Sequence, residues 1–360
     1  MNHFKHPLGL AGCVAALLML LPTSPQAQTS SVSGFMTLSY SLSNNSSRYL
    51  RSIDDGGTFR SGSIVGVQLD SKFSNTLSST IQVAAFESDR KDHATRADFK
   101  WAILNYRPSS AWLLRGGKMR NNLVLDAQNL DIGATYTPAR LPPEIYFSTN
   151  LLEYYGGSLT HYFDITRRVE GSLEVFGGRT DTYIRTLGNN SSNAFFINVP
   201  LNLVGLNVKA EADKYAAQFN LSEYKNANNS SMDFRVQVKT IGLRGPVGPV
   251  MGRIEFFKAD YPDQSNGPKS QSGAVIVEKT LGKLTPYTTL AYSKEESGLQ
   301  NGQQRKNRSV ALGAAYSLET LSKLKAELKH IKTGEDSALF DNAPPYLDTN
   351  VMTLSFSKIF

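Results

Sequence analysis

The chain has 360 residues, of which 40% are hydrophobic and 19% are charged, and it carries a net charge of +7. The basic side chains are scattered along the sequence, which argues against a nucleic-acid-binding surface. Cys13 is the only cysteine, so the chain can form no internal disulfide. After residue 27, no apolar stretch approaches the ~18 residues that a membrane-spanning helix needs.

The first residues have the pattern of a secretory signal. Lys5 and His6 precede an apolar run from Leu8 to Leu21. A basic start followed by an apolar core of about 7–15 residues is typical of such signals. We therefore predict a signal peptide over residues 1–27 and a mature chain over residues 28–360.

The rest of the sequence alternates between strand-like runs of about ten residues and breaks rich in Asn, Ser, Gly, Asp and Pro. No segment shows sustained helical periodicity. The predicted strands cover residues 34–43, 62–73, 76–86, 97–107, 111–119, 152–163, 168–179, 199–210, 213–224, 232–244, 248–261, 271–280, 284–295, 305–317, 320–333 and 349–360. This makes sixteen strands, with fourteen or eighteen as open alternatives.

Hydrophobic and polar residues alternate within these strands. Val204, Leu206 and Val208 are separated by polar or small residues, and so are Phe219 and Leu221. A soluble half-exposed sheet would show the same period. However, sixteen such strands without covering helices would expose a large apolar surface, which lipid can cover and water cannot.

The breaks are alternately short and long, as in a barrel with short turns on one side of a membrane and long loops on the other. The last predicted strand ends on an aromatic residue, Phe360. A closed barrel can end in this way because its last strand pairs with its first. The sequence thus predicts an all-β fold, a transmembrane antiparallel β-barrel.

These features resemble the Gram-negative outer-membrane porins of the sixteen-stranded general type, over essentially the whole mature chain. The segments 112–118, 131–136 and 139–146 are also similar to porin-like proteins of proteobacteria. The resemblance implies a water-filled lumen, an inward-folded third loop, a homotrimer in the outer membrane, and contact with outer-membrane lipid and lipopolysaccharide. It also implies that Phe360 acts as an assembly signal.

The longest break, residues 120–151, follows the fifth predicted strand, where such porins place their constriction loop. Loops of this length are usually functional or disordered. We expect this one to be ordered inside the barrel, with a surface loop or an extra strand pair over 131–136 as alternatives. Its charged residues are constriction candidates: Arg120, Asp126, Asp131, Arg140 and Glu144.

Charged residues of the predicted strands complete the candidate site. Placed on the lumen face by alternation, they are the bases Arg115, Arg235, Lys239, Arg253, Lys325 and Lys329 and the acids Asp70, Glu174, Glu255 and Glu327. Opposed rows of such charges across a narrow gap would create a transverse field and select solutes by radius and sign. Alternatively, they only solvate a wide lumen.

We therefore expect a non-enzymatic channel for passive diffusion of small hydrophilic solutes, with a mild preference for anions. A solute-selective porin for an anionic or sugar substrate is an alternative. A closed adhesive barrel and a barrel hydrolase, for example with Ser158 and His161 paired, are others. No P-loop, HExxH or GxSxG motif and no metal-ligand spacing occurs, so we expect no cofactor, no metal and no nucleic-acid partner.

Overall fold

The computed structural model describes residues 29–87, 95–147, 153–187, 194–227, 235–263, 268–296, 304–341 and 344–360. The predicted signal peptide lies outside the described residues. Within them, no helix is long and apolar enough to cross a membrane.

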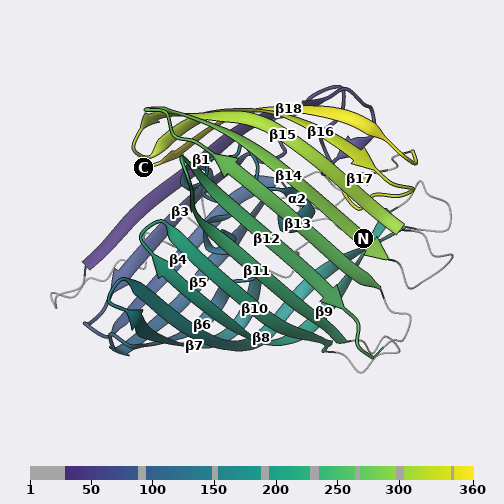
Figure 1. Ribbon diagram of the computed structural model, residues 1–360. Coiled ribbons are helices and arrows are strands. Elements are labelled where there is room, and N and C mark those ends of the chain that lie inside the picture. The colour runs from purple at the N-terminus through teal and green to yellow at the C-terminus, as the bar shows by residue number, and fades with distance from the viewer. Residues whose placement is uncertain are drawn as a thin grey trace, which may run out of the picture.

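Sixteen antiparallel strands form a closed barrel (Figure 1). This confirms the predicted fold and strand count. The strands are β1 (Thr29–Ser43), β3 (Ile64–Lys72), β4 (Leu77–Glu87), β5 (Thr95–Ser109), β6 (Trp112–Arg120), β7 (Glu153–Thr166), β8 (Val169–Leu187), β9 (Ala194–Ala212), β10 (Tyr215–Asn226), β11 (Arg235–Val247), β12 (Val250–Asp260), β13 (Lys269–Glu278), β14 (Leu284–Glu296), β15 (Gln304–Glu319), β16 (Ser322–Thr333) and β18 (Asp348–Ile359).

Each strand pairs with its neighbour in the sequence, and β18 closes the barrel against β1. The backbone amide of Phe360 donates to the carbonyl of Gly34 over 2.8 Å, and the amide of Gly34 donates to the carbonyl of Phe360 over 2.6 Å. The last residue of the chain therefore takes part in the closure.

Short turns gather at one end of the barrel, which we call the turn end; it lies on the left in Figure 1, together with the C-terminus. Two of these turns contain Gly248 and Gly282 with φ of 58° and 63°. Glycine reaches this left-handed region without steric cost, which suits a tight reversal of the chain. The longer connections lie at the opposite end, the loop end.

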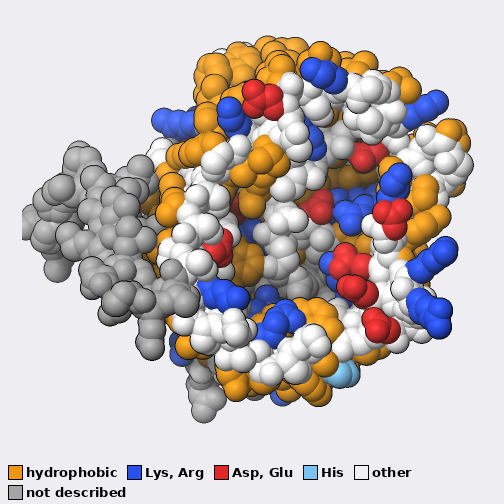
Figure 2. Space-filling view, turned by 90° about the vertical axis from the view of Figure 1, so that its left-hand side faces the viewer, with side chains coloured by type: hydrophobic (Ala, Val, Ile, Leu, Met, Phe, Trp, Pro, Cys, Tyr) orange, Lys and Arg blue, Asp and Glu red, His pale blue; other side chains and the backbone are white. Residues whose placement is uncertain are grey.

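Side chains alternate between the lumen and the outer surface. On β16, Lys325, Glu327 and Lys329 are buried inside, whereas Leu324 and Leu328 are 45% and 56% exposed on the outer face. Figure 2 views the turn end: acidic and basic side chains lie around a hollow, and hydrophobic ones gather on the outer rim. This is the two-sided pattern of a barrel that faces lipid outside and polar groups inside.

Two loop-end segments meet over one side of the barrel. β2 (Arg48–Tyr49) and β17 (Phe340–Asp341) form a separate two-stranded sheet. Tyr49, Ile53, Leu339 and Phe340 are almost completely buried in one hydrophobic cluster beneath it. These two strands are not part of the barrel wall, so the barrel has sixteen strands and not eighteen.

The segment after β6 lies within the barrel. It contains two 3₁₀ turns, η1 (Ala127–Asn129) and η2 (Gly133–Thr135), and one short helix, α2 (Pro143–Tyr146). The alternative of an extra strand pair over 131–136 is therefore wrong. Residues 148–151 of the predicted loop lie outside the described residues. We call residues 121–147 the inner loop.

Candidate functional site

Backbone groups at the start of the inner loop are held by polar side chains of the barrel wall. The carbonyl of Asn122 accepts hydrogen bonds from Asn207 over 2.9 Å and from Gln218 over 2.7 Å. The hydroxyl of Thr240 donates to the carbonyl of Leu123. Irregular backbone leaves carbonyl groups without backbone partners, and these wall side chains satisfy the ones that the loop buries.

A buried charged cluster fixes the middle of the inner loop to β12. Arg253 forms ion pairs with Asp126 of the loop and with Glu255 of its own strand, and it also donates to the hydroxyl of Tyr146. That hydroxyl donates to Glu255 over 2.9 Å. Burial, reinforced by the Glu255 carboxylate, raises the pKa of Tyr146 well above its ordinary value, so the phenol remains a donor.

A second set of contacts fixes the end of the inner loop to β15 and β16. Glu144 is fully buried and accepts from Ser309 over 2.6 Å and from Lys329 over 3.2 Å. The ammonium of Lys325 donates to the carbonyls of Gly133 over 2.6 Å and Pro138 over 2.9 Å. These contacts hold residues 133–144 of the loop against β15 and β16, whereas its first part is held by β9 to β12.

The phenol of Tyr287 on β14 connects the backbone of the inner loop to a carboxylate of the barrel wall. It accepts a hydrogen bond from the amide of Ala139 over 2.8 Å and donates to Glu327 over 2.8 Å. Glu327 is thereby satisfied inside the barrel wall rather than facing open lumen.

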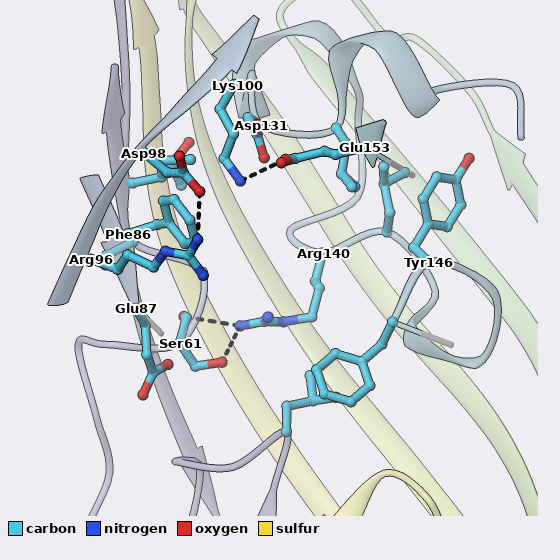
Figure 3. A pocket seen from close by; sticks show the side chains of 18 of the residues that line it. Ser61, Phe86, Glu87, Arg96, Asp98, Lys100, Asp131, Arg140, Tyr146 and Glu153 are labelled. Carbon is cyan, nitrogen blue, oxygen red and sulfur yellow. Dashed lines mark hydrogen bonds and ion pairs between the residues drawn. The ribbon is translucent and has the colours of Figure 1, made fainter. Parts of the chain in front are cut away.

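A cavity of about 560 Å³ remains between the inner loop and the barrel wall formed by the loop-end parts of β3 to β8. Figure 3 shows Asp131 and Arg140 of the loop together with Arg96, Asp98 and Lys100 of β5, while the hydroxyl of Tyr146 points away from the β5 side chains. The ring-bearing residues Phe86, Tyr136, Tyr146, Phe147 and Tyr155 also line it.

The charges of this cavity are balanced in number. Its lining holds the five bases Arg51, Arg96, Lys100, Lys118 and Arg140 and the five acids Glu87, Asp98, Asp131, Glu153 and Asp181. Most bases are paired: Lys100 contacts Glu153 over 2.9 Å, and Arg96 contacts Asp98 over 2.6 Å. Because the charges largely neutralise one another, the total count by itself favours neither sign of solute.

Arg140 differs from the other four bases of the cavity. Its guanidinium donates to the carbonyl of Ser61 over 2.9 Å and to its hydroxyl over 3.0 Å (Figure 3). Among the residues that the structure describes, no carboxylate forms an ion pair with it. Arg140 thus carries a positive charge into the cavity that no described acid neutralises by direct contact.

Of the fifteen charged residues predicted for the candidate site, only Asp131 and Arg140 line this cavity. Asp126, Glu144, Arg253, Glu255, Lys325, Glu327 and Lys329 lie inside the barrel, where they hold the inner loop or its anchors. Arg115 is paired with Glu174 below the loop, and Arg120 is buried against Asp131 and Glu153. Most of these charged side chains therefore hold the inner loop in place and do not border the cavity.

Arg235 and Lys239 were placed in the lumen by alternation, but they lie on the outer face of β11. Val236 and Val238 of the same strand are buried in the interior cluster with Leu123 and Ile145. The inner loop makes this part of the lumen apolar, so the hydrophobic positions point inward and the charged ones outward. This corrects the sequence-based assignment of the two residues.

The sequence reasoning missed the charged wall of the cavity. Arg96, Asp98 and Lys100 recur at every second position of β5, which was a usable signal. A register shift between Gln82 and Val83 of β4 opposite these residues is an irregularity that alternation does not reveal. Lys118 and Glu153 meet the β5 charges only through the pairing of neighbouring strands.

The structure does not form the serine–histidine pair considered from the sequence. Ser158 accepts a hydrogen bond from Arg115 over 3.1 Å, while the ring of His161 lies against Trp112 with 4.3 Å between ring centroids and a tilt of 33°. Within the described ranges, no group of three or more His, Cys, Asp or Glu residues could hold a metal ion.

Comparisons with known proteins give matches by structure alone. No known family and no curated protein matches the sequence. The barrel is similar to OmpF of Salmonella typhi, solved with daunomycin, at a TM-score of 0.62 and 12% identity over 92% of this chain and 97% of that one.

Two further similar structures extend this likeness. An anion-selective porin from Comamonas acidovorans has a TM-score of 0.58 and 13% identity, over 92% of this chain and 100% of that chain. A loop-deletion mutant of OmpT, an outer membrane protein of Vibrio cholerae, has a TM-score of 0.60 and 13% identity, over 93% and 100%. The chain therefore has the fold of sixteen-stranded outer-membrane porins, as expected from the sequence.

Proposed function

We propose that this chain is a channel in the Gram-negative outer membrane through which small hydrophilic solutes diffuse passively. The observation that carries the proposal is the charged cavity of about 560 Å³ beside the inner loop, within a barrel whose outer face is apolar. A loop that narrows a polar lumen without filling it is what a size-selective pore requires. The similar outer-membrane porin structures support this reading.

We also propose a mild preference for anions, which rests on Arg140. A guanidinium presents a planar set of donors that matches carboxylate, phosphate and sulfate groups. The similar structure from Comamonas acidovorans is described as anion-selective, which supports the same direction.

Single-channel current through the refolded protein in a planar bilayer tests both statements. A salt gradient should give stable current steps and a reversal potential displaced toward that of the anion. A folded barrel that gives no steps would contradict the channel. Steps with a cation-leaning reversal potential would leave the channel and contradict the anion preference.

A solute-selective porin is the second candidate, favoured by the aromatic side chains that line the cavity beside its charges. Aromatic faces next to hydrogen-bonding groups can hold a sugar or an organic anion. Block of the ion current that saturates with solute concentration would support this candidate. Current that stays unchanged by a panel of sugars and organic anions would favour unselective diffusion.

The proposal also covers removal of the signal peptide, the oligomeric state and the lipid contacts of the channel. We propose that residues 1–27 are removed, that the mature barrel forms a homotrimer, and that it contacts outer-membrane lipid and lipopolysaccharide. Mass spectrometry of the mature protein and chemical cross-linking in membranes test the first two statements.

A further inference from the structure

The connection between β1 and β3 bulges out of the barrel wall close to the inner loop. β1 and β3 pair regularly up to Thr37 and Ile64, and Ser41 pairs with Thr58 further toward the loop end. Between these two pairs, β1 contributes three residues and the connection contributes five, residues 59–63. The surplus residues cannot follow the strand ladder. We call residues 59–63 the first-loop bulge.

The first-loop bulge is exposed at its start and buried at its middle. Phe59 is 59% exposed and packs against Tyr40 of β1 with 4.8 Å between ring centroids. Ser61 is only 3% exposed and lines the charged cavity. At the end of the bulge, the hydroxyl of Ser63 accepts a hydrogen bond from the amide of Ser39 over 2.9 Å, in the place of a strand partner. The bulge is therefore an ordered part of the cavity wall.

Arg140 of the inner loop is fixed from two different sides. Its backbone lies between Ala139, whose amide donates to the hydroxyl of Tyr287 over 2.8 Å, and the buried Leu141. Its guanidinium is held by the bulge instead, because Nη2 donates to the carbonyl of Ser61 over 2.9 Å and to its hydroxyl over 3.0 Å (Figure 3). The barrel wall thus places the backbone of Arg140, and the first-loop bulge places its charge.

Gly62 leaves the space that this guanidinium occupies. Its φ is 84°, a backbone conformation that glycine adopts without steric cost. A Cβ built on Gly62 would lie 2.9 Å from Nη2 of Arg140. The guanidinium is the far end of a flexible side chain, so an added methyl group would displace it before it displaced the backbone.

The other donors of this guanidinium stay available to a solute. Among the residues that the structure describes, Nε and Nη1 of Arg140 have no hydrogen-bond partner, whereas Nη2 is held by Ser61. A side chain that is already ordered loses less conformational entropy when it binds an anion. Arg140 therefore combines free donors with a fixed position.

We propose that the first-loop bulge sets the solute selectivity of the cavity by positioning Arg140: Ser61 holds the guanidinium and Gly62 makes room for it. This rests on the proposed anion preference. The solutes concerned are small oxyanions such as carboxylates, whose oxygens match the guanidinium donors. Ser61 and Gly62 are positioning residues, because they act through Arg140 and not on the solute.

The test measures anion-to-cation permeability ratios of the refolded mature chain in planar bilayers. Gradients of potassium chloride and of potassium acetate, a carboxylate probe, give the reversal potentials. Gly62→Ala should lower the ratio about twofold in both salts, because it moves the charge of Arg140 away from the solute without removing it. A ratio equal to that of the wild type would overturn the proposal.

Gly248→Ala at the turn end is the matched control. Gly248 has a φ of 58°, so the substitution strains the backbone in the same way, and no atom lies within 4 Å of the added Cβ. The control should keep the wild-type ratio. An equal drop in the control would mean that backbone strain alone changes the ratio, which overturns the proposal.

A double variant separates positioning from a change in the shape of the pore. In the Arg140→Gln background, Gly62→Ala should cause no further change in the ratio, because the group that it displaces is absent. The same drop in both backgrounds would show an effect that does not pass through Arg140 and would contradict the proposal.

Ser61→Ala decides the question if Gly62→Ala does not fold. It removes the hydroxyl acceptor without adding an atom, so it should lower the ratio less than Arg140→Gln does, and only while Arg140 is present. An unchanged ratio would overturn the role of the bulge.

Failure of the proposed function has a different signature. Absence of current in the wild type would contradict the channel, and a wild-type ratio in Arg140→Gln would contradict the anion preference. If Arg140→Gln lowers the ratio while Gly62→Ala leaves it unchanged, only the positioning role of the first-loop bulge is wrong.

Discussion

Charged residues of the same type have different roles in this lumen because their surroundings differ. Arg253 is buried between Asp126 and Glu255, where its charge is compensated. Arg140 reaches the cavity and is held by the neutral groups of Ser61. A solute can respond only to a field that is not cancelled locally, so the two arginines should affect different properties.

Replacement of Arg140 by Gln should lower the anion-to-cation permeability ratio about two- to fivefold. The reason is that a unit charge within a few ångströms of a solute contributes on the order of 1 kcal/mol even in water. Reversal potentials in a salt gradient measure the ratio. Lys214→Gln at the turn end is the control and should leave it unchanged; an unaltered ratio in Arg140→Gln would remove this residue from the selectivity determinant.

Replacement of Arg253 by Ala should act on stability instead. It leaves the buried carboxylates of Asp126 and Glu255 without their partner, which typically costs about 3–5 kcal/mol. Urea unfolding of the refolded barrel, followed by tryptophan fluorescence, measures the loss. Lys258→Ala on the outer face of the same strand should stay within about 0.5 kcal/mol of wild type. Equal effects of the two changes would contradict the anchoring role.

At the scale of elements, the inner loop is fixed at both of its halves and so narrows the lumen from one side. Its backbone is irregular, and wall side chains satisfy it, with Thr240 and Lys325 as donors to its carbonyls. A loop held in this way should stay inside the barrel under native conditions rather than fold over the mouth.

A disulfide can test this position directly. A Cβ built on Gly133 would lie 3.3 Å from the Cβ of Ser357, slightly less than the ~3.5–4.5 Å of natural disulfides. It would also lie 2.4 Å from the hydroxyl oxygen of Thr37, so the side chain of Thr37 has to rotate away from the new cysteine. The double variant Gly133→Cys with Ser357→Cys should therefore cross-link on mild oxidation. Faster migration on a non-reducing gel would show the link, and the predicted mature chain has no other cysteine.

The control for the cross-link uses Phe356, the residue directly before Ser357 in the same strand. Phe356 points to the outer face, so Gly133→Cys with Phe356→Cys should give no intramolecular link. Efficient linking in the control, or none in the Ser357 variant, would contradict the inward position of the loop.

At the scale of the molecule, closure of the barrel depends on the pairing of its two ends. The ring of Phe360 covers Gly34, where a Cβ would approach it to 2.4 Å, and the backbones of the two residues exchange hydrogen bonds. Closing the wall also removes the unpaired edges that β1 and β18 would otherwise expose.

Replacement of Phe360 by Ala should reduce the amount of assembled barrel in the outer membrane severalfold, because it removes the aromatic contact at the seam and the proposed assembly signal. The fraction that migrates as a compact species before heating measures assembly. Tyr346→Ala at an exposed loop-end position is the control. Normal assembly of the Phe360 variant would contradict the role of this residue.

The sequence by itself determined the all-β barrel, the alternation that separates an apolar outer face from a polar interior, and the closing role of the last strand. These are local properties, because a period of two residues and a turn signal are visible in any short window. The sequence predicted sixteen strands but left fourteen and eighteen open, and the structure decided the count. It also indicated which segment enters the lumen, through the length and charge of the break after the fifth strand.

Only the tertiary structure decided which charges border open space. Once the inner loop is in place, Lys325, Lys329 and Arg253 are covered by its backbone and carboxylates, whereas Arg96 and Lys100 on the facing wall remain at the cavity. The loop also makes the interior apolar beside Val236 and Val238, which turns Arg235 and Lys239 outward. These assignments depend on which distant surface a strand faces, and the alternation within one strand carries no information about that.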